Sequence, residues 1–308
     1  MRAMTHLVNM GSSIDSRNFT RVGCVGAGVM GHSWATLFAV KGYQVALQDI
    51  SEDNLERAMG WIKTALDLMA EKTVIQLSEV KPALSRIHPT TDLSEAVGEA
   101  DFVLESVYED YGAKRDIFRD MDSHAPEDAI LATGSSWLLI TEIQKATGRP
   151  ERCVGAHGFN PPHLVPLVEI VPGEATSPET VERTRALMEG LGKTPIVVRK
   201  EVAGYLGNRI QSAVHQAARD IVESGIATVE EVDLAVSTGI GLRWALYGPF
   251  AVTYFNTPSH LIDRYGISGL VAEGFQEHSL MKGRTFDEMV RWRNGKLMDM
   301  LRVLERTD

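Results

Sequence analysis

The sequence is poor in cysteine, in net positive charge and in long apolar runs, and each shortage excludes a class of protein. Its two cysteines, Cys24 and Cys153, both lie in apolar runs typical of strands. This predicts buried thiols and argues against a disulfide framework or a catalytic thiol. No apolar run reaches the roughly 20 residues of a membrane-spanning helix. The formal net charge of −10 argues against nucleic acid or an anionic membrane as a partner. We therefore expect a cytoplasmic protein.

The composition is that of a globular protein. Hydrophobic residues make up 44% and charged residues 23% of the sequence, which is ordinary for a folded domain. The 308 residues are enough for one large or two medium domains with proper cores. Residues 1–19 are polar and lack the apolar core of a signal peptide, so we expect a flexible extension there.

The most informative segment is the glycine-rich run that joins a predicted strand, Arg21–Val25, to a predicted helix, Gly28–Val40. In a dinucleotide site the first glycine allows a sharp turn, the second lets backbone N–H groups approach a pyrophosphate, and the third lets the helix pack closely. The start of the helix adds unpaired N–H groups and a partial positive charge. The predicted cofactor-binding residues here are Gly26, Gly28, Val29, Met30 and Gly31.

A second predicted strand, Gln44–Asp49, ends in a carboxylate that is placed to bind a ribose diol. A glycine-rich turn alone also occurs in plain strand–helix connections, but an acid in register after the second strand favours a dinucleotide site. The acid repels a 2′-phosphate, and Ile50 and Ser51 follow it in place of an arginine. We therefore expect NAD, not NADP, as the cofactor and predict no metal site.

Apolar runs alternate with amphipathic segments along the first two-thirds of the chain, which predicts crossover units and an α/β, Rossmann-type, doubly wound and mostly parallel sheet. Glu52–Leu84 is longer than a simple crossover and indicates a long helix or a helical hairpin. The further predicted strands are 102–105, 129–132, 153–156, 168–171 and 195–198, with helices at Ala113–Met121 and Pro178–Leu191.

After Lys200 the strand pattern stops and helices follow. We expect helices at Ile210–Val222, at Val229–Val236 behind a Thr228 cap, and at Phe286–Leu304. The predicted domains are a flexible extension at 1–19, an NAD-binding domain at 20–200 and a smaller all-α substrate and dimerisation domain at 201–308.

Residues suited to chemistry lie at strand ends. His157 precedes an Asn160-Pro-Pro loop, and Glu169 lies in the next predicted strand. If the two strands are neighbours, the carboxylate fixes the tautomer of the imidazole and leaves the other ring nitrogen free to accept a proton. A dehydrogenase needs such a base, because hydride leaves an alcohol carbon only as the hydroxyl proton departs. The alternative is a structural histidine bonded to backbone. Ser136 and Asn208 lie in loop and helix-start segments that are also compatible with purely structural roles.

The chain resembles the L-3-hydroxyacyl-CoA dehydrogenase superfamily over nearly its whole length from Arg21. The resemblance rests on the order and spacing of Gly26–Gly31, His157–Pro161, Glu169 and Gly204–Arg209. The resemblance implies that His157 is the catalytic base, with Glu169 orienting it, and that Ser136 and Asn208 hold the reacting oxygen, with Asn160 beside the substrate. It also implies a cytosolic or organellar homodimer joined through the helical domains. The residues that match positions lining the cofactor are Glu105, Glu109 and Lys114.

The segment Gly239–Phe250 is longer than the short turn of fatty-acyl-CoA enzymes and is more similar to the λ-crystallin branch, that is, L-gulonate 3-dehydrogenase. Carnitine dehydrogenases share its arginine-containing turn. Arg243 could bind a free carboxylate bidentately, which a thioester substrate lacks, or it could pair with a structural acid. Two departures, Gly134 in place of the usual Asn and Trp137 in place of a small residue, put the exact substrate in doubt.

These observations predict an NAD-dependent dehydrogenase that oxidises a small L-3-hydroxy acid, with Arg243 on its carboxylate. The alternatives are a dehydrogenase of CoA or carrier-protein thioesters, or a carnitine dehydrogenase with Trp137, Trp244 and Tyr247 around the ammonium group. A different class of alternative is a non-catalytic structural protein that retains NAD binding.

Overall fold

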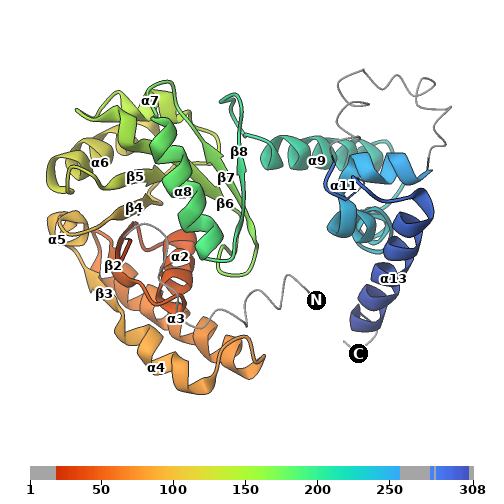
Figure 1. Cartoon of the computed structure of the whole chain (residues 1–308), viewed down its shortest axis with the longest axis horizontal. Coiled ribbons are helices and arrows are strands. Elements are labelled where there is room, and N and C mark those ends of the chain that lie inside the picture. The colour runs from red at the N-terminus through yellow and green to blue at the C-terminus, as the bar shows by residue number, and fades with distance from the viewer. Residues whose placement is uncertain (1–18, 257–277, 281, 305–308) are drawn as a thin grey trace. The chain divides into compact units, whose positions relative to one another are not determined.

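A computed structural model describes residues 19–256, 278–280 and 282–304, which divide into two units after Gln211. The first unit contains an eight-stranded sheet in the order β3-β2-β1-β4-β5-β6-β7-β8 (Figure 1). Every neighbouring pair is parallel except β6 and β7, which are antiparallel. The strands are β1 (Arg21–Val25), β2 (Gln44–Gln48), β3 (Ile87–Thr90), β4 (Phe102–Glu105), β5 (Ile130–Thr133), β6 (Cys153–Gly158), β7 (Leu167–Val171) and β8 (Thr194–Val197). The predicted mostly parallel, doubly wound sheet is confirmed.

Helices cover both faces of this sheet, and a separate apolar cluster lies under each layer. One cluster joins the sheet to α2 (Val29–Val40), α3 (Glu52–Glu71), α4 (Leu77–Ser85) and α8 (Pro178–Gly190). The other joins it to α5 (Leu93–Val97), α6 (Tyr111–His124) and α7 (Ile140–Gln144), and a short 3-10 helix, η1 (Pro150–Arg152), precedes β6. The strands are apolar along their length because both faces are buried. Cys24 and Cys153 are free, buried thiols, and burial raises the pKa of each to about 12.

Of the long helix or helical hairpin expected over Glu52–Leu84, the structure shows the hairpin, which α3 and α4 form by packing against each other. The Ser51 hydroxyl accepts a hydrogen bond from the Asn54 N–H at 3.3 Å and so caps α3, and acidic residues occupy its first turn. Leu55, Ile62 and Leu66 recur at helical spacing and are buried. The hairpin is therefore attached to the domain by one apolar stripe.

The second unit is helical in its described part. Its helices are the later turns of α9 (Gly207–Glu223), then α10 (Val229–Ala235), a π-helical turn η2 (Val236–Ile240), α11 (Gly241–Asn256) and α13 (Phe286–Leu304). The predicted Thr228 cap at the start of α10 is confirmed, and the Glu231 side chain completes a capping box there. The expected turn at 239–250 is wrong in form, because the chain there is helical and is broken only at Gly248, whose φ is 67°.

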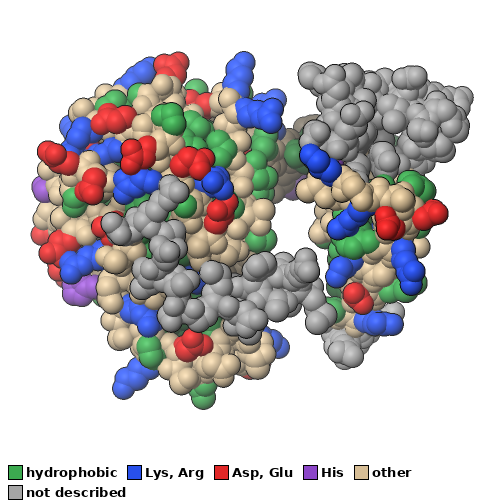
Figure 2. All heavy atoms as spheres, viewed as in Figure 1, with side chains coloured by type: hydrophobic (Ala, Val, Ile, Leu, Met, Phe, Trp, Pro, Cys, Tyr) green, Lys and Arg blue, Asp and Glu red, His purple; other side chains and the backbone are tan. Residues whose placement is uncertain are grey.

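The predicted extension falls almost wholly outside the described residues. Its last residue, Phe19, is buried and meets Phe102 edge to face, so this residue packs against the domain and is not part of a flexible extension. Acidic and basic side chains are interspersed on the face of the first unit that Figure 2 displays. Among the described residues, no helix combines the length and the apolar character needed to cross a membrane.

Candidate active site

The glycine-rich turn between β1 and α2 has the geometry that its sequence predicts. Gly26 has a φ of 93°, in the left-handed region. A Cβ on Gly31 would overlap the carbonyl oxygen of Gly26, so only glycine allows this close approach. A Cβ on Gly28 would meet nothing within 4 Å, and α2 begins there without a side-chain cap. Val29 is exposed and Met30 half-buried beside this open space. Uncapped N–H groups next to open space fit a phosphate.

Asp49 follows β2 and is fixed beside the glycine turn. Its Oδ2 accepts a hydrogen bond from the Ala27 N–H at 2.9 Å, and its Oδ1 accepts one from Asn54 Nδ2, also at 2.9 Å. The carboxylate is therefore held where the dinucleotide fingerprint places its ribose-binding acid. The residues of the turn and this acid together fit a bound NAD.

His157 and Glu169 face each other across the antiparallel pair β6–β7. The register pairs the two residues directly, so their side chains share one face of the sheet. The imidazole Nδ1 lies 2.8 Å from Glu169 Oε2, and Nε2 lies 3.1 Å from Ser136 Oγ. The structure places His157 within β6, one residue beyond the predicted end of that strand at residue 156. Its side chain is 4% exposed, and the Nε2 edge of the ring points to the half-buried Ser136.

The Glu169 carboxylate is completely buried but well satisfied. Its second oxygen, Oε1, accepts hydrogen bonds from the Leu206 and Gly207 N–H groups at 2.8 and 2.9 Å. Burial alone raises the pKa of this carboxyl, but the hydrogen bonds from His157 and from these two amides outweigh it and hold the pKa below its ordinary value. An ionised Glu169 keeps the proton of the imidazole on Nδ1, which leaves Nε2 as an acceptor.

The other predicted substrate-side residues differ in how near they come to this pair. Asn208 lies in the first turn of α9, and its Nδ2 donates to the Ser136 carbonyl oxygen at 3.4 Å. Asn160 is exposed two residues after β6 and precedes Pro161 through a cis peptide bond. The structure thus brings Ser136, His157, Glu169 and Asn208 together, and it shows no contact of Asn160 with them.

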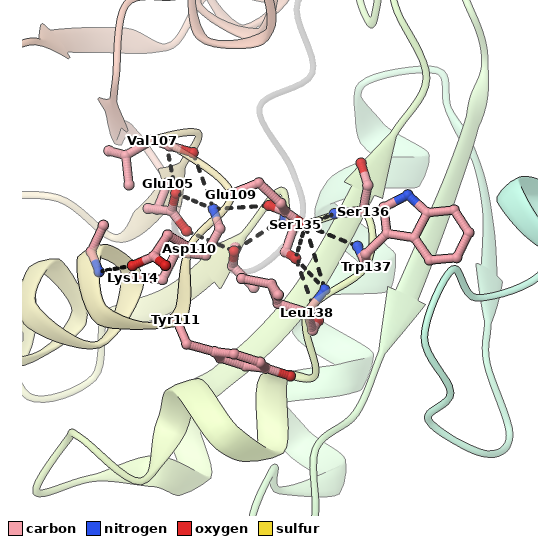
Figure 3. Close-up of polar contacts among 12 residues, drawn as sticks. Glu105, Val107, Glu109, Asp110, Tyr111, Lys114, Ser135, Ser136, Trp137 and Leu138 are labelled. Atoms are coloured by element: carbon pink, nitrogen blue, oxygen red, sulfur yellow. Dashed lines mark hydrogen bonds and ion pairs between the residues drawn. The ribbon is translucent and has the colours of Figure 1, made fainter.

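The three residues expected to line the cofactor form one polar cluster (Figure 3). Lys114 Nζ donates to Glu105 Oε1 at 2.6 Å, and both side chains are buried, at 1% and 0% exposure. Glu109 lies 3.5 Å from the same Nζ and is 36% exposed. Glu109 is therefore the most exposed member of the cluster, and contact of all three residues with NAD stays a prediction.

Arg243 lies in α11 of the second unit and is half-buried. Among the described residues, no ion pair or hydrogen bond involves its guanidinium. This does not support the alternative in which Arg243 pairs with a structural acid. Tyr247 is buried against Phe255 and Trp292, with ring centroids 5.2 and 6.3 Å away. Tyr247 is thus a core residue of the second unit, which removes it from the suggested aromatic face.

Trp137 is 47% exposed, and its ring packs on the Cα of Gly204. A Cβ on Gly204 would lie 2.6 Å from the indole, so this glycine is needed beneath the ring. Gly134 lies directly after β5, where a Cβ would come within 3.2 Å of the Glu105 carbonyl oxygen. The indole next to Ser136 therefore shapes the surface beside the reacting groups.

Sequence reasoning missed three contributors to this geometry. Tyr205 has a φ of 45°, donates its hydroxyl to the Leu138 carbonyl at 2.9 Å and packs 5.5 Å from the His157 ring. The amides of Leu206 and Gly207 bind Glu169. Gly204 directly before Tyr205 and Gly207 two residues after it are the signal in the sequence that indicates such a tight turn.

Comparison with known proteins adds a family to this geometry. Residues 21–202 match the model of the 3-hydroxyacyl-CoA dehydrogenase NAD binding domain, and residues 204–297 match that of the 3-hydroxyacyl-CoA dehydrogenase C-terminal domain. The chain belongs to the 3-hydroxyacyl-CoA dehydrogenase family. The resemblance inferred from the sequence is thereby confirmed, as are NAD as the cofactor and an oxidoreductase activity.

Three relatives place the chain within the 3-hydroxyacyl-CoA dehydrogenase family. A lambda-crystallin homolog of Homo sapiens is 39% identical, covering 79% of this chain and 78% of the relative. An L-carnitine dehydrogenase of Nocardiopsis dassonvillei is 34% identical over 93% of this chain and 92% of its own. The solved structure of an NAD+-dependent dehydrogenase of a hydroxypyridine carboxylic acid, described as a dismutase, is 30% identical, with a TM-score of 0.75 over 94% of this chain and 99% of its own.

Proposed function

We propose that this enzyme oxidises a small L-3-hydroxy acid, L-gulonate-like or related, to the 3-keto acid. One contact set carries the proposal: His157 lies between Glu169 Oε2 at 2.8 Å and Ser136 Oγ at 3.1 Å. An imidazole with an acid on one nitrogen and a hydroxyl on the other has the arrangement of a general base.

The residues of the chain have separate tasks in this reaction. Ser136 Oγ and Asn208 Nδ2 donate hydrogen bonds to the C3 oxygen of the substrate and hold it near the imidazole. His157 Nε2 takes the hydroxyl proton, and Glu169 stabilises the resulting imidazolium through Nδ1. Bound NAD supplies the hydride acceptor. Because Glu169 is fully buried, its charge acts on the imidazole with little screening by water.

The choice of a free acid over a thioester rests on Arg243 and on the names of the relatives. A guanidinium with no acid partner among the described residues can bind a substrate carboxylate with two parallel hydrogen bonds. L-Carnitine, the substrate that the name of one relative states, is itself a 3-hydroxy carboxylate.

Initial rates of NADH formation with L-gulonate, L-3-hydroxybutyrate, its CoA thioester and L-carnitine test this proposal. We expect turnover of one or more of the free acids. Arg243→Met should raise the KM for that acid by about tenfold or more, the value of one lost charge-assisted pair, while the KM for NAD stays unchanged. Gln216→Met, on an exposed part of α9, is a control that should change neither constant. Activity confined to the thioester would contradict the role given to Arg243 and favour the family's acyl-CoA reaction.

A further inference from the structure

The carboxylate of Glu109 lies at the centre of a tight turn and binds its backbone (Figure 3). Its Oε1 accepts hydrogen bonds from Ser135 Oγ at 2.6 Å and from the N–H groups of Ser136 and Trp137 at 2.9 Å each. The Leu138 N–H lies 3.4 Å from the same oxygen. One carboxylate oxygen therefore collects donors from four consecutive residues after β5.

This carboxylate is itself held in place. Lys114 Nζ lies 3.5 Å from Glu109 Oε2 and is anchored in the interior by Glu105. Burial tends to raise the pKa of Glu109, but the hydrogen bonds from Ser135 and from the amides of Trp137 and Ser136, together with the Lys114 charge, hold the pKa below its usual value. Glu109 is thus ionised at neutral pH, and hydrogen bonds to an ionised acceptor are stronger than neutral ones.

The turn that Glu109 holds carries Ser136, whose Oγ lies 3.1 Å from His157 Nε2. Backbone N–H groups in such a turn have no partners from regular secondary structure, so the carboxylate decides where the backbone lies. At the far end of the turn, Tyr205 donates its hydroxyl to the Leu138 carbonyl at 2.9 Å. The position of the Ser136 hydroxyl is therefore set by an acid from the loop after β4, a different strand end.

We propose that Glu109 is a positioning residue for Ser136: its carboxylate orders residues 135–138 so that the Ser136 hydroxyl meets the substrate oxygen beside His157. This rests on the proposed function, in which Ser136 holds that oxygen. Two carboxylates then divide the task, since Glu169 orients the imidazole and Glu109 orients the hydroxyl. A role for Glu109 in the turn differs from the direct cofactor contact that the family resemblance implies, and the two make different predictions.

Glu109→Gln keeps the shape of the side chain and removes its charge. Measured with saturating NAD, we expect kcat to fall by about 10- to 100-fold, because displacement of a reacting group by about 1 Å costs up to that much. The Kd for NAD, from fluorescence titration, should stay within about twofold. Ser135→Ala removes one donor to Glu109 and should lower kcat less, in the same direction. Asp92→Asn is the matched control: Asp92 Oδ1 accepts from Ser94 N and Oγ at 2.8 and 2.7 Å and caps α5, which carries none of the reacting groups, so its loss should leave kcat unchanged.

A double-mutant cycle with Ser136→Ala separates a positioning role from a structural one. If Glu109 acts through Ser136, Glu109→Gln should lower kcat little further once the hydroxyl is absent. Additive losses in the double variant would overturn the inference, as would a Kd for NAD that rises tenfold while kcat at saturation is unchanged. Wild-type kcat in Ser136→Ala alone would contradict the proposed function itself, and the two failures are therefore distinguishable.

Discussion

At the scale of single residues, the site depends on two carboxylates, Glu169 and Glu109, that are each satisfied by several donors. Glu169 has the imidazole on one oxygen and two backbone amides on the other. The His157–Glu169 pair could be predicted from the sequence, because both residues lie in adjacent apolar runs and antiparallel pairing brings them together. The amides of Leu206 and Gly207 could not, since their turn follows in a later part of the chain and has no apolar period.

The lowered pKa of Glu169 makes a prediction about stability and pH. The folded-state pKa lies below its ordinary value of 4.5, so the stability that this carboxylate contributes is fully present above pH 4.5. That contribution is lost as the pH falls through the lower, folded-state pKa. Glu169→Gln should therefore lower the free energy of unfolding by about 1–3 kcal/mol at neutral pH, with the difference shrinking in acid.

Urea unfolding of both proteins at neutral pH and in acid, over the pH range in which the wild type remains folded, measures this difference. Glu56→Gln on the exposed face of α3 is the control, and we expect it to stay within about 0.5 kcal/mol of the wild type. An equal gap at every pH would mean that the ionisation of Glu169 does not stabilise the fold.

At the scale of elements, the long periodic segments could be predicted and the short or irregular ones could not. The first two strands, β1 and β2, and the final helix, α13, lie where their sequence patterns place them. β3 escaped prediction because it is a short edge strand whose interior residues are His88 and Pro89. α11 escaped it because Gly248 and Pro249 interrupt the helical pattern.

The close approach of α2 to the glycine turn gives a prediction at this scale. Gly31→Ala places a Cβ against the Gly26 carbonyl oxygen, so we expect a loss of about 1–3 kcal/mol of stability from overpacking and a weakened Kd for NAD. Gly60→Ala is the matched control, because a Cβ there meets nothing within 4 Å in the middle of α3. It should raise stability by about 0.5–1 kcal/mol. Thermal unfolding and NAD titration of both variants check this, and wild-type behaviour of Gly31→Ala would contradict the packing argument.

At the scale of the whole molecule, the chain combines two domains of the family. The first unit contains the glycine turn, Asp49 and the His157–Glu169 pair, and the second unit contains Arg243, whose part in substrate binding stays a prediction. A homodimer joined through the helical domain stays a prediction. The composition and the periodicity of apolar residues could predict a sheet domain followed by a helical one. They could not identify the substrate, because loop residues such as Trp137 decide the shape of the surface beside the reacting groups.

The central claim is that His157 is the base of an NAD-dependent oxidation. The most direct test is kcat for NADH formation by His157→Asn, measured at saturating NAD with the acid that the wild type turns over, alongside the Kd for NAD. The account predicts that kcat falls by about 10²–10⁴-fold, the value of a positioned general base, while the Kd for NAD changes less than about twofold. A kcat within about threefold of the wild type would contradict it.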